Sequence, residues 1–293
     1  MKYFFCIGFF VFTALFLVGC SDKNHFEKTL LTMDTVAKLS AEGLDAKAAV
    51  AESIERLQEI DALAGSDEEK SDILRLEQNA GGEYVAISRG VMTMLKFSQV
   101  YSKATGGAWD ATIGPLVALW DIGGKNHVPN LEELTTAKKL VGYDKLLLDE
   151  AKGSALLEIP GMSLHLGGIA KGYALDEVRR IYEKHNVKSG LIDLGGSSIY
   201  ALGSNGDKPW RIGLRHPRSR EVKYFAVVSL KDEALSTSGD YERFFEEKGH
   251  RYHHIIDPKT GQPAATGLVS VTVIATGGEN PGLATDVLST ALF

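Results

Sequence analysis

The spacing of apolar residues changes along the chain, from a helical period to short strand-like runs. Between Asp45 and Gly65 the apolar residues Val50, Ile54 and Leu57 and their successors recur every three or four positions, as on one face of an α-helix. Further helices are predicted over 88–104, 130–142, 169–185 and from about 281 to the end. Short apolar or alternating runs, bounded by Gly, Pro, Asn and Asp, predict strands at 145–148, 155–159, 191–194, 199–202, 210–214, 224–230 and 268–275. This order predicts an α+β fold with a mixed, largely antiparallel sheet and packed helices, arranged as one body or as two interlocked lobes.

Residues 1–19 are predicted to be a signal peptide and not part of the fold. The apolar run from Phe4 to Val18 is shorter than the roughly 20 residues that a membrane-spanning helix needs. It ends at a small residue before Cys20, and polar residues follow, a pattern similar to a bacterial lipoprotein signal in which that cysteine is acylated. A membrane anchor with an incidental cysteine is the alternative. We therefore expect a polar tether over residues 20–32 and a lipid-anchored protein outside the cytoplasm, on the periplasmic side if there are two membranes.

Composition excludes several functional classes. The chain has 32 Lys and Arg against 38 Asp and Glu, so there is no basic excess for nucleic-acid binding. Of the two cysteines, Cys6 lies in the predicted signal peptide. The mature chain is therefore expected to have neither a disulfide nor a cysteine metal site.

Two glycine-containing stretches are suited to binding phosphate. Residues 166–172, Leu-Gly-Gly-Ile-Ala-Lys-Gly, stand where a strand is expected to turn into a helix. Glycines allow a ligand close to the backbone, and a helix start offers free N–H groups, although a tight turn with close packing is the alternative. Residues 236–241, Ser-Thr-Ser-Gly-Asp-Tyr, lead into Arg243 and offer hydroxyls to diphosphate or ribose oxygens. A plain β-turn with side-chain capping is the alternative there.

A third stretch contains three histidines. On a strand, His250 and His254 would share one face while His253 points away, which disfavours a mononuclear metal triad. His254 and Asp257, next to a Pro-x-x-Gly turn, could move or steer the proton of a hydroxyl group. Two satisfied structural side chains are the alternative.

A fourth pattern is Asp286 with Thr290, which are four residues apart and so lie on one face of a helix. Together with a backbone carbonyl they would form an oxygen-only set suited to Mg²⁺. Taken alone, Asp286 is simply a residue in the first turn of a helix.

Taken in order, these stretches resemble the bacterial flavin transferase (ApbE) family, the FAD:protein FMN transferases. The resemblance runs from about Met33 to the end, which predicts a transferase domain over 33–293. The motifs that carry it are Thr-Met-Asp-Thr at 32–35, Ala-Trp-Asp-Ala-Thr-Ile-Gly-Pro-Leu at 108–116, the stretch at 166–173, Asp-Leu-Gly-Gly at 193–196, Thr-Ser-Gly-Asp-Tyr at 237–241, His-Ile-Ile-Asp-Pro-Lys-Thr-Gly at 254–261, and Asp-x-x-x-Thr at 286–290.

The resemblance implies an enzyme that binds FAD and Mg²⁺, transfers FMN to a threonine hydroxyl of a partner protein and releases AMP. It implies cofactor contacts at Met33, Ala108, Trp109, Asp110, His165, Lys171, Thr237, Ser238, Gly239 and Ile256. It places the metal at the Gly168 carbonyl, Asp286 and Thr290, and the group that activates the acceptor at His254 with Asp257. The acceptors it implies are subunits of sodium-pumping NADH:quinone reductase or Rnf-type complexes, or other extracytoplasmic flavoproteins.

The chain departs from the family pattern at several positions. Asp34 stands where the family has Gly, His165 stands where it has Asp, and the loop Ser66–Lys70 lacks an expected aromatic residue. The family also continues beyond the position of Phe293, so the sequence is expected to be incomplete or its metal site destabilised. Two rival functions remain at this point, hydrolysis of FAD to FMN and AMP, and FAD binding without catalysis.

Overall fold

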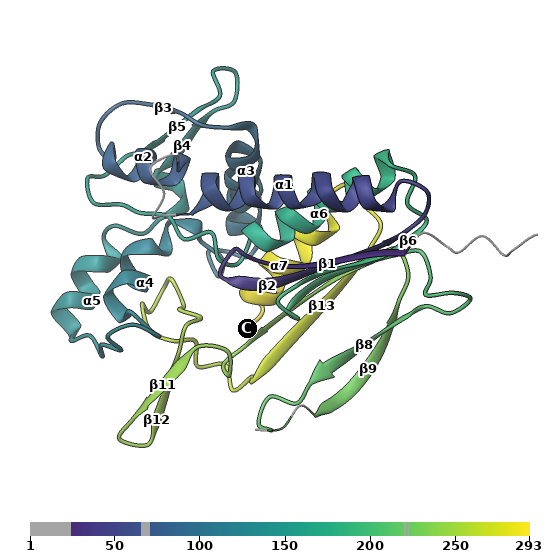
Figure 1. The fold of residues 1–293 in the computed structure, drawn as a ribbon. Coiled ribbons are helices and arrows are strands. Elements are labelled where there is room, and N and C mark those ends of the chain that lie inside the picture. The colour runs from purple at the N-terminus through teal and green to yellow at the C-terminus, as the bar shows by residue number, and fades with distance from the viewer. Residues whose placement is uncertain (1–24, 66–70, 220, 222) are drawn as a thin grey trace, which may run out of the picture.

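The computed structural model describes residues 25–65, 71–219, 221 and 223–293, and a six-stranded sheet forms its centre (Figure 1). Every pairing in this sheet is antiparallel. Its strands, in spatial order, are β1 (His25–Thr32), β2 (Thr35–Glu42), β6 (Ser189–Leu194), β7 (Ser198–Leu202), β10 (Glu233–Gly239) and β13 (Ser270–Thr276). The prediction of an α+β fold with a largely antiparallel sheet is confirmed.

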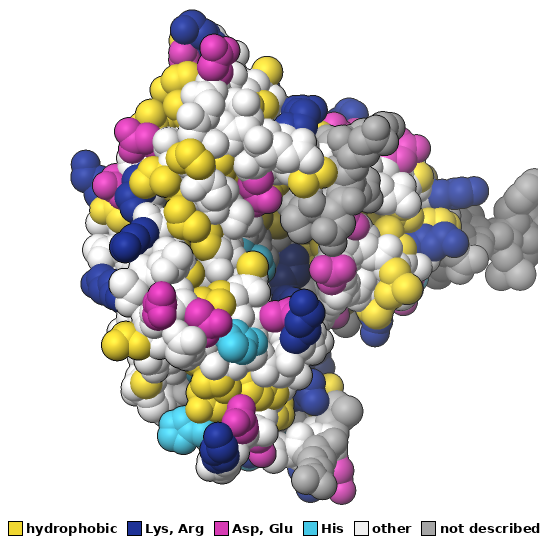
Figure 2. Space-filling model, turned by 90° about the vertical axis from the view of Figure 1, so that its left-hand side faces the viewer, with side chains coloured by type: hydrophobic (Ala, Val, Ile, Leu, Met, Phe, Trp, Pro, Cys, Tyr) yellow, Lys and Arg dark blue, Asp and Glu magenta, His cyan; other side chains and the backbone are white. Residues whose placement is uncertain are grey.

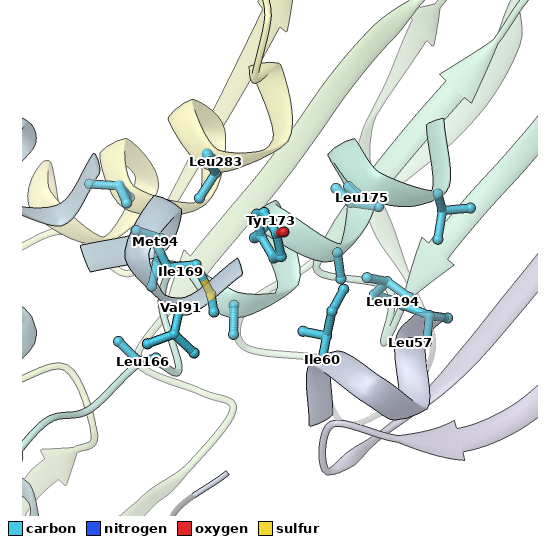
Figure 3. Packing of buried hydrophobic residues seen from close by; sticks show 14 of the residues in the cluster. Leu57, Ile60, Val91, Met94, Leu166, Ile169, Tyr173, Leu175, Leu194 and Leu283 are labelled. Carbon is cyan, nitrogen blue, oxygen red and sulfur yellow. The ribbon is translucent and has the colours of Figure 1, made fainter. Parts of the chain in front are cut away.

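Three helices cover one face of the sheet (Figure 1). Helix α1 (Ala46–Ala64) packs on β1 and β2, α6 (Ala170–Lys184) on β6 and β7, and α7 (Pro281–Ala291) on β10 and β13. Helix α3 (Arg89–Ala104) contacts α1 and α7. Their apolar faces meet in the main hydrophobic core, which includes Leu57, Ile60, Val91, Met94, Tyr173, Leu175, Leu194 and Leu283 (Figure 3).

Smaller units surround this centre. They are α2 (Asp72–Gln78), the short helices η1 (Ala111–Ile113) and η2 (Tyr143–Lys145), the pair α4 (Gly114–Trp120) and α5 (Leu131–Lys138), the sheet β3 (Val85–Ala86), β5 (Ser154–Leu157) and β4 (Leu146–Asp149), and the hairpins β8 (Trp210–Arg215) with β9 (Tyr224–Leu230) and β11 (Phe244–Glu247) with β12 (His250–His253). Hairpin β8–β9 packs on the sheet face opposite the helices, where Leu230 and Leu235 share a buried cluster. Hairpin β11–β12 joins α4 and α5 through a cluster that contains Trp120 and Tyr252.

The predicted helices and strands are present, with boundaries that shift by a few residues. The third predicted helix ends at Lys138 and not at Gly142, and Asn130 caps its start in a capping box. The prediction of a tether as far as residue 32 is wrong for His25–Thr32, which pairs with β2 along its whole length. The sequence of this segment does not alternate like a strand, because β1 is an edge strand and mainly Phe26, Leu30 and Thr32 face the protein interior.

Several sequence predictions lie outside the described residues, namely the signal peptide 1–19, Cys20 and the loop Ser66–Lys70. Among the helices that the structure describes, none combines the length and the apolar character needed to cross a bilayer.

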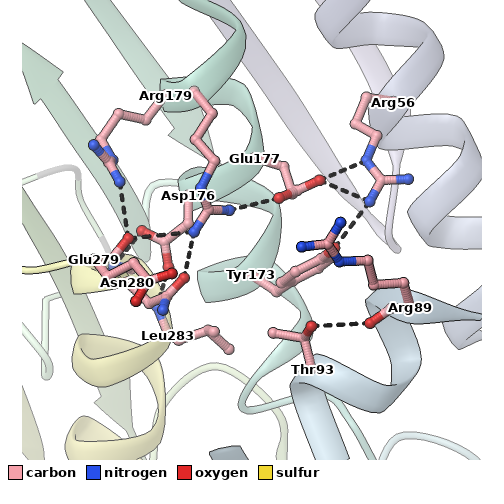
Figure 4. A network of polar contacts seen from close by, with 12 residues as sticks. Arg56, Arg89, Thr93, Tyr173, Asp176, Glu177, Arg179, Glu279, Asn280 and Leu283 are labelled. Atoms are coloured by element: carbon pink, nitrogen blue, oxygen red, sulfur yellow. Dashed lines mark hydrogen bonds and ion pairs between the residues drawn. The ribbon is translucent and has the colours of Figure 1, made fainter. Parts of the chain in front are cut away.

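Helices α6 and α7 cross closely through a pair of glycines. A Cβ atom added to Gly172 would stand 2.3 Å from the Gly282 carbonyl oxygen. Asp176 of α6 also holds the two helices together, because its carboxylate accepts hydrogen bonds from the backbone N–H groups of Gly282 and Leu283 at 2.8 and 2.9 Å. Burial of this carboxyl raises its pKa to about 6. Figure 4 shows these contacts next to the ion pairs that Glu177 makes with Arg56 and a neighbouring arginine.

We expect Gly172→Ala to destabilise the protein by about 1–3 kcal/mol, since the added methyl group overlaps backbone that cannot rotate away. Urea unfolding followed by circular dichroism would measure this as a lower midpoint at an unchanged slope. A midpoint equal to that of the wild type would show that the two helices can move apart without cost.

The turn between β1 and β2 has a conformation that favours glycine. Met33 and Asp34 have φ values of 52° and 54°, the left-handed pair of a two-residue hairpin turn. The carboxylate of Asp61 in α1 accepts the Met33 N–H at 2.8 Å and the Thr32 hydroxyl at 2.9 Å, and so ties the turn to the helix layer. A glycine at the position of Asp34, which the family resemblance implies, would adopt this conformation without steric cost.

We expect Asp34→Gly to stabilise the protein by about 0.5–1 kcal/mol, because glycine adopts positive φ without a steric penalty. Asp34→Ala is the matched variant and should change stability in the opposite direction. Melting temperatures of the two variants would test this, and a shift of the same sign in both would refute the backbone explanation.

Candidate functional site

Several of the predicted site residues gather at one end of the central sheet, where two turns and the start of a helix meet. The β1–β2 turn lies against the β6–β7 turn, since a Cβ atom on Gly195 would stand 2.1 Å from the Thr35 hydroxyl. Lys171, in the first turn of α6, reaches the second of these turns and donates to the Ser197 hydroxyl at 2.8 Å. Met33 and Lys171, far apart in sequence, are therefore brought to the same end of the fold.

Next to them lies a buried carboxylate surrounded by hydroxyl groups. Asp286 in the second turn of α7, not the first as predicted, accepts the Gly172 N–H at 2.9 Å and the Ser198 hydroxyl at 3.3 Å. Burial raises the pKa of this carboxyl, and Lys171 acts against that shift. The Thr290 hydroxyl donates to the Asp286 carbonyl at 3.2 Å and lies 3.2 Å from the Ser238 hydroxyl.

Gly168 completes this group, because a Cβ atom placed on it would stand 3.0 Å from the Thr290 hydroxyl and 2.8 Å from the Trp109 ring. The three residues predicted to bind metal are thus adjacent, and every ligand atom they offer is oxygen. One carboxylate with hydroxyls and a carbonyl is a set that fits Mg²⁺, which commonly completes its shell with water and substrate phosphate. Over the described part of the chain, no cluster of three or more His, Cys, Asp or Glu side chains could hold a metal instead.

The predicted Thr237–Gly239 turn is not a turn but the last three residues of β10. Side chains alternate along a strand, so Ser238 faces α7 while Thr237 faces the opposite side of the sheet. There the Thr237 hydroxyl pairs with that of Thr272 at 2.9 Å. The prediction therefore grouped two hydroxyls that the structure separates, and only Ser238 contacts the Asp286–Thr290 group.

The stretch 108–110 supports the site from behind. Trp109 is buried, and its indole N–H donates to the Ser98 hydroxyl at 2.8 Å. Both carboxylate oxygens of Asp110 are engaged, one by the backbone and hydroxyl of Thr112 and the other by the Tyr143 N–H. Asp110 thus holds η1 and η2 in place, and burial raises its pKa. Ala108 is exposed beside them.

A pocket lies next to the Gly167–Gly168 segment and is lined by Val117, Trp120, Ile122, His165, Arg243, His254 and Ile256. The segment that enters it, residues 163–166, is an irregular loop and not the predicted strand, and the His165 N–H donates to the Ala111 carbonyl at 2.8 Å. Burial lowers the pKa of His165 to about 4, and the charge of Arg243 adds to that shift. Figure 2 shows this side of the molecule hollowed, with His and Lys or Arg side chains inside the hollow.

The backbone of Arg243, and not Asp257, orients His254. The His254 Nδ1 atom lies 3.2 Å from the Arg243 carbonyl oxygen. Because a carbonyl can only accept, Nδ1 carries the hydrogen and Nε2 keeps its lone pair. Burial and then the charge of Arg243 lower the pKa of His254 to about 4, so the ring is neutral at pH 7.

The predicted pairing of His254 with Asp257 is not made. The Asp257 carboxylate accepts the Lys259 N–H at 2.9 Å and shapes the turn that ends at Gly261. Sequence reasoning also missed Ser197 and Ser198, which contact Lys171 and Asp286. Their position directly after the Gly195-Gly196 turn was the only signal available.

Comparisons with known proteins show the family to which the chain is similar. Residues 33–293 match the model of the ApbE family. The chain is 37% identical over 225 residues to the FAD:protein FMN transferase of Klebsiella pneumoniae (strain 342), covering 76% of this chain and 68% of the relative. It is 35% identical over 261 residues to the protein of that name from Treponema pallidum (strain Nichols), covering 84% and 71%.

Solved structures are similar over most of the fold. The crystal structure of the ApbE protein from Thermotoga maritima MSB8 superposes with a TM-score of 0.82 at 31% sequence identity, over 91% of this chain and 85% of that one. The flavin transferase ApbE from Vibrio cholerae gives a TM-score of 0.80 at 28% identity, over 92% and 87%.

Proposed function

The chain belongs to the ApbE family and acts as an FAD:protein FMN transferase, and we propose that it uses Mg²⁺, attaches FMN to a threonine hydroxyl and releases AMP. The observation that best supports the proposal is the placement of two unlike groups next to Gly167 and Gly168. Gly168 adjoins the oxygen atoms of Thr290 and Asp286, and Gly167 adjoins the pocket that contains the neutral imidazole of His254. The first suits a diphosphate and its cation, and the second suits a hydroxyl nucleophile.

Different residues of the site have separate roles in the transfer. Asp286, Thr290 and the Gly168 carbonyl would hold Mg²⁺, which when bound neutralises charge on the diphosphate. Lys171 adds a positive charge at the same end of the sheet. His254 Nε2 takes the proton from the threonine hydroxyl as its oxygen bonds to the phosphorus of the FMN half of FAD. The P–O bond to the AMP half breaks, and AMP leaves with the bridging oxygen and its electron pair.

We further propose that the protein works outside the cytoplasm on a lipid anchor at Cys20, as the sequence pattern suggests. Its acceptors would then be extracytoplasmic flavoproteins, such as subunits of sodium-pumping NADH:quinone reductase or Rnf-type complexes. Metabolic labelling with a fatty acid tests the anchor, because Cys20→Ala should abolish incorporation. Incorporation at the wild-type level in that variant would refute it.

A single assay tests the function. Purified protein is mixed with FAD, MgCl₂ and a threonine-bearing acceptor domain, and acceptor mass and AMP are followed together. Equal amounts of AMP and FMN-modified acceptor would support transfer. AMP without modified acceptor would mean hydrolysis by water, and absence of both products would mean that FAD is only bound.

A further inference from the structure

Arg243 is a cation without a partner in the described part of the chain. Its guanidinium makes no ion pair or hydrogen bond there, although acidic residues lie one and three positions before it. Those residues are engaged elsewhere: Asp240 binds Arg218 through two contacts of 2.6 Å, and Glu242 lies 4.0 Å from Arg215. Arginines of hairpin β8–β9 and of the loop at its tip thus engage the two carboxylates nearest to Arg243 in sequence, and Arg243 has no partner among the described residues.

The pocket that Arg243 lines contains no acidic side chain. Its walls are the apolar side chains of Val117, Ile122 and Ile256 with Trp120, and its other polar members are His165 and His254. Both imidazoles are neutral near pH 7, so the pocket carries a net charge of one positive unit. Apolar walls exclude competing water and strengthen the attraction between a guanidinium and an anion.

Gly167 and Gly168 connect the pocket with the oxygen atoms of Asp286 and Thr290. A Cβ atom on Gly167 would stand 2.7 Å from the His165 ring, and one on Gly168 would stand 3.0 Å from the Thr290 hydroxyl. A ligand that crosses this glycine pair would therefore meet Asp286 and Thr290 on one side and Arg243 on the other. A diphosphate ester, with anionic oxygens on two adjacent phosphorus atoms, has this shape and charge.

We propose that Arg243, in the pocket that it lines with His165 and His254, forms an oxyanion subsite that binds the phosphoryl group being transferred. The inference rests on the proposed function, because it identifies the anion as the phosphoryl group of FAD. The planar guanidinium of Arg243 donates to two phosphoryl oxygens while His254 Nε2 faces the incoming hydroxyl. The same residue thus orients the base through its carbonyl and binds the phosphoryl oxygens through its side chain.

The test combines a rate with a binding constant measured without flavin. We expect Arg243→Gln to lower kcat for FMN transfer by about 100-fold or more, as for other donors to a developing oxyanion. Arg243→Lys should recover part of that loss, and added guanidinium chloride should partly rescue the Gln variant. Calorimetry with inorganic pyrophosphate and MgCl₂ should show at least about tenfold weaker binding to Arg243→Gln. Arg211→Gln is the control, because Arg211 is exposed on β8 and makes no ion pair with the described residues.

The outcomes separate this inference from the proposed function. Unchanged kcat and pyrophosphate affinity in Arg243→Gln would overturn the subsite while transfer by the wild type stands. A lower kcat without weaker pyrophosphate binding or guanidinium rescue would also overturn it, since a structural role explains that result. Equal weakening in Arg211→Gln would overturn it as a general surface-charge effect. Weaker pyrophosphate binding with no transfer by the wild type would support an anion subsite and reject the proposed function.

Discussion

Replacing Asp286 with alanine should lower the rate of FMN transfer by about 10³-fold or more while much of the affinity for FAD remains. Gly168, Thr290 and Ser238 contribute neutral oxygen atoms, and Asp286 contributes the carboxylate. Its loss therefore removes the negative charge that would retain a cation there. Affinity for FAD should fall less, since Met33 and Lys171 lie at the same end of the sheet and are hydrogen-bonded to Asp61 and Ser197 and not to that carboxylate. Single-turnover transfer and FAD fluorescence titration measure the two quantities separately.

The control must distinguish lost chemistry from lost folding, because Asp286 also accepts hydrogen bonds from Gly172 and Ser198. Asp286→Asn keeps the size of the side chain and an acceptor oxygen, and should be nearly as inactive as the alanine variant. Ser198→Ala removes only the longer of the two hydrogen bonds, so its rate should fall less than about tenfold. A folded Asp286→Asn variant with wild-type turnover would contradict the proposed role of the carboxylate.

The sequence was sufficient to predict elements whose pattern is local. Helix α1 was predictable because Val50, Leu57 and Ile60 recur on one face, and the third helix was predicted to start at Asn130, where the structure has a capping box. Strand β1 was not, because most of its side chains face solvent and its stability comes from pairing with β2. An edge strand with few inward side chains shows little alternation of apolar and polar residues, even where its partner is the next strand in the sequence.

In the candidate site, too, contacts within one element were predictable and contacts between elements were not. The contact between Asp286 and Thr290 lies within one helix, so their spacing predicted it. Thr237 and Ser238 were adjacent in sequence and were grouped, but the alternation of a strand places them on opposite faces. The partner of His254 was misassigned because Asp257, the nearest acidic residue in sequence, accepts a hydrogen bond within the turn that follows it. The backbone carbonyl of Arg243, between β10 and β11, lies against the His254 ring instead.

Replacing His254 with alanine should slow transfer by about 10²–10⁴-fold and leave FAD bound, because a threonine hydroxyl is a poor nucleophile without a base. The pH dependence gives a sharper test. Burial disfavours the protonated ring and lowers the pKa of His254 to about 4, and the positive charge of Arg243 and the nearby His253 and His165 act in the same direction. The base form therefore persists to lower pH than for an ordinary histidine, and kcat/KM for the wild type should stay level as the pH falls from 8 through 6.5.

Folding has to be followed over the same pH range, since the unfolded chain binds a proton at His254 near pH 6.5 and the folded chain only near 4. Stability from this group is present above pH 6.5 and is lost as the pH falls toward 4. His250→Ala is the matched control, because His250 lies on the same hairpin, is exposed and is separated from the pocket by the length of β12. Equal rates in the two alanine variants, or an acid limb centred near pH 6.5 that His254→Ala does not alter, would assign the proton transfer to another group.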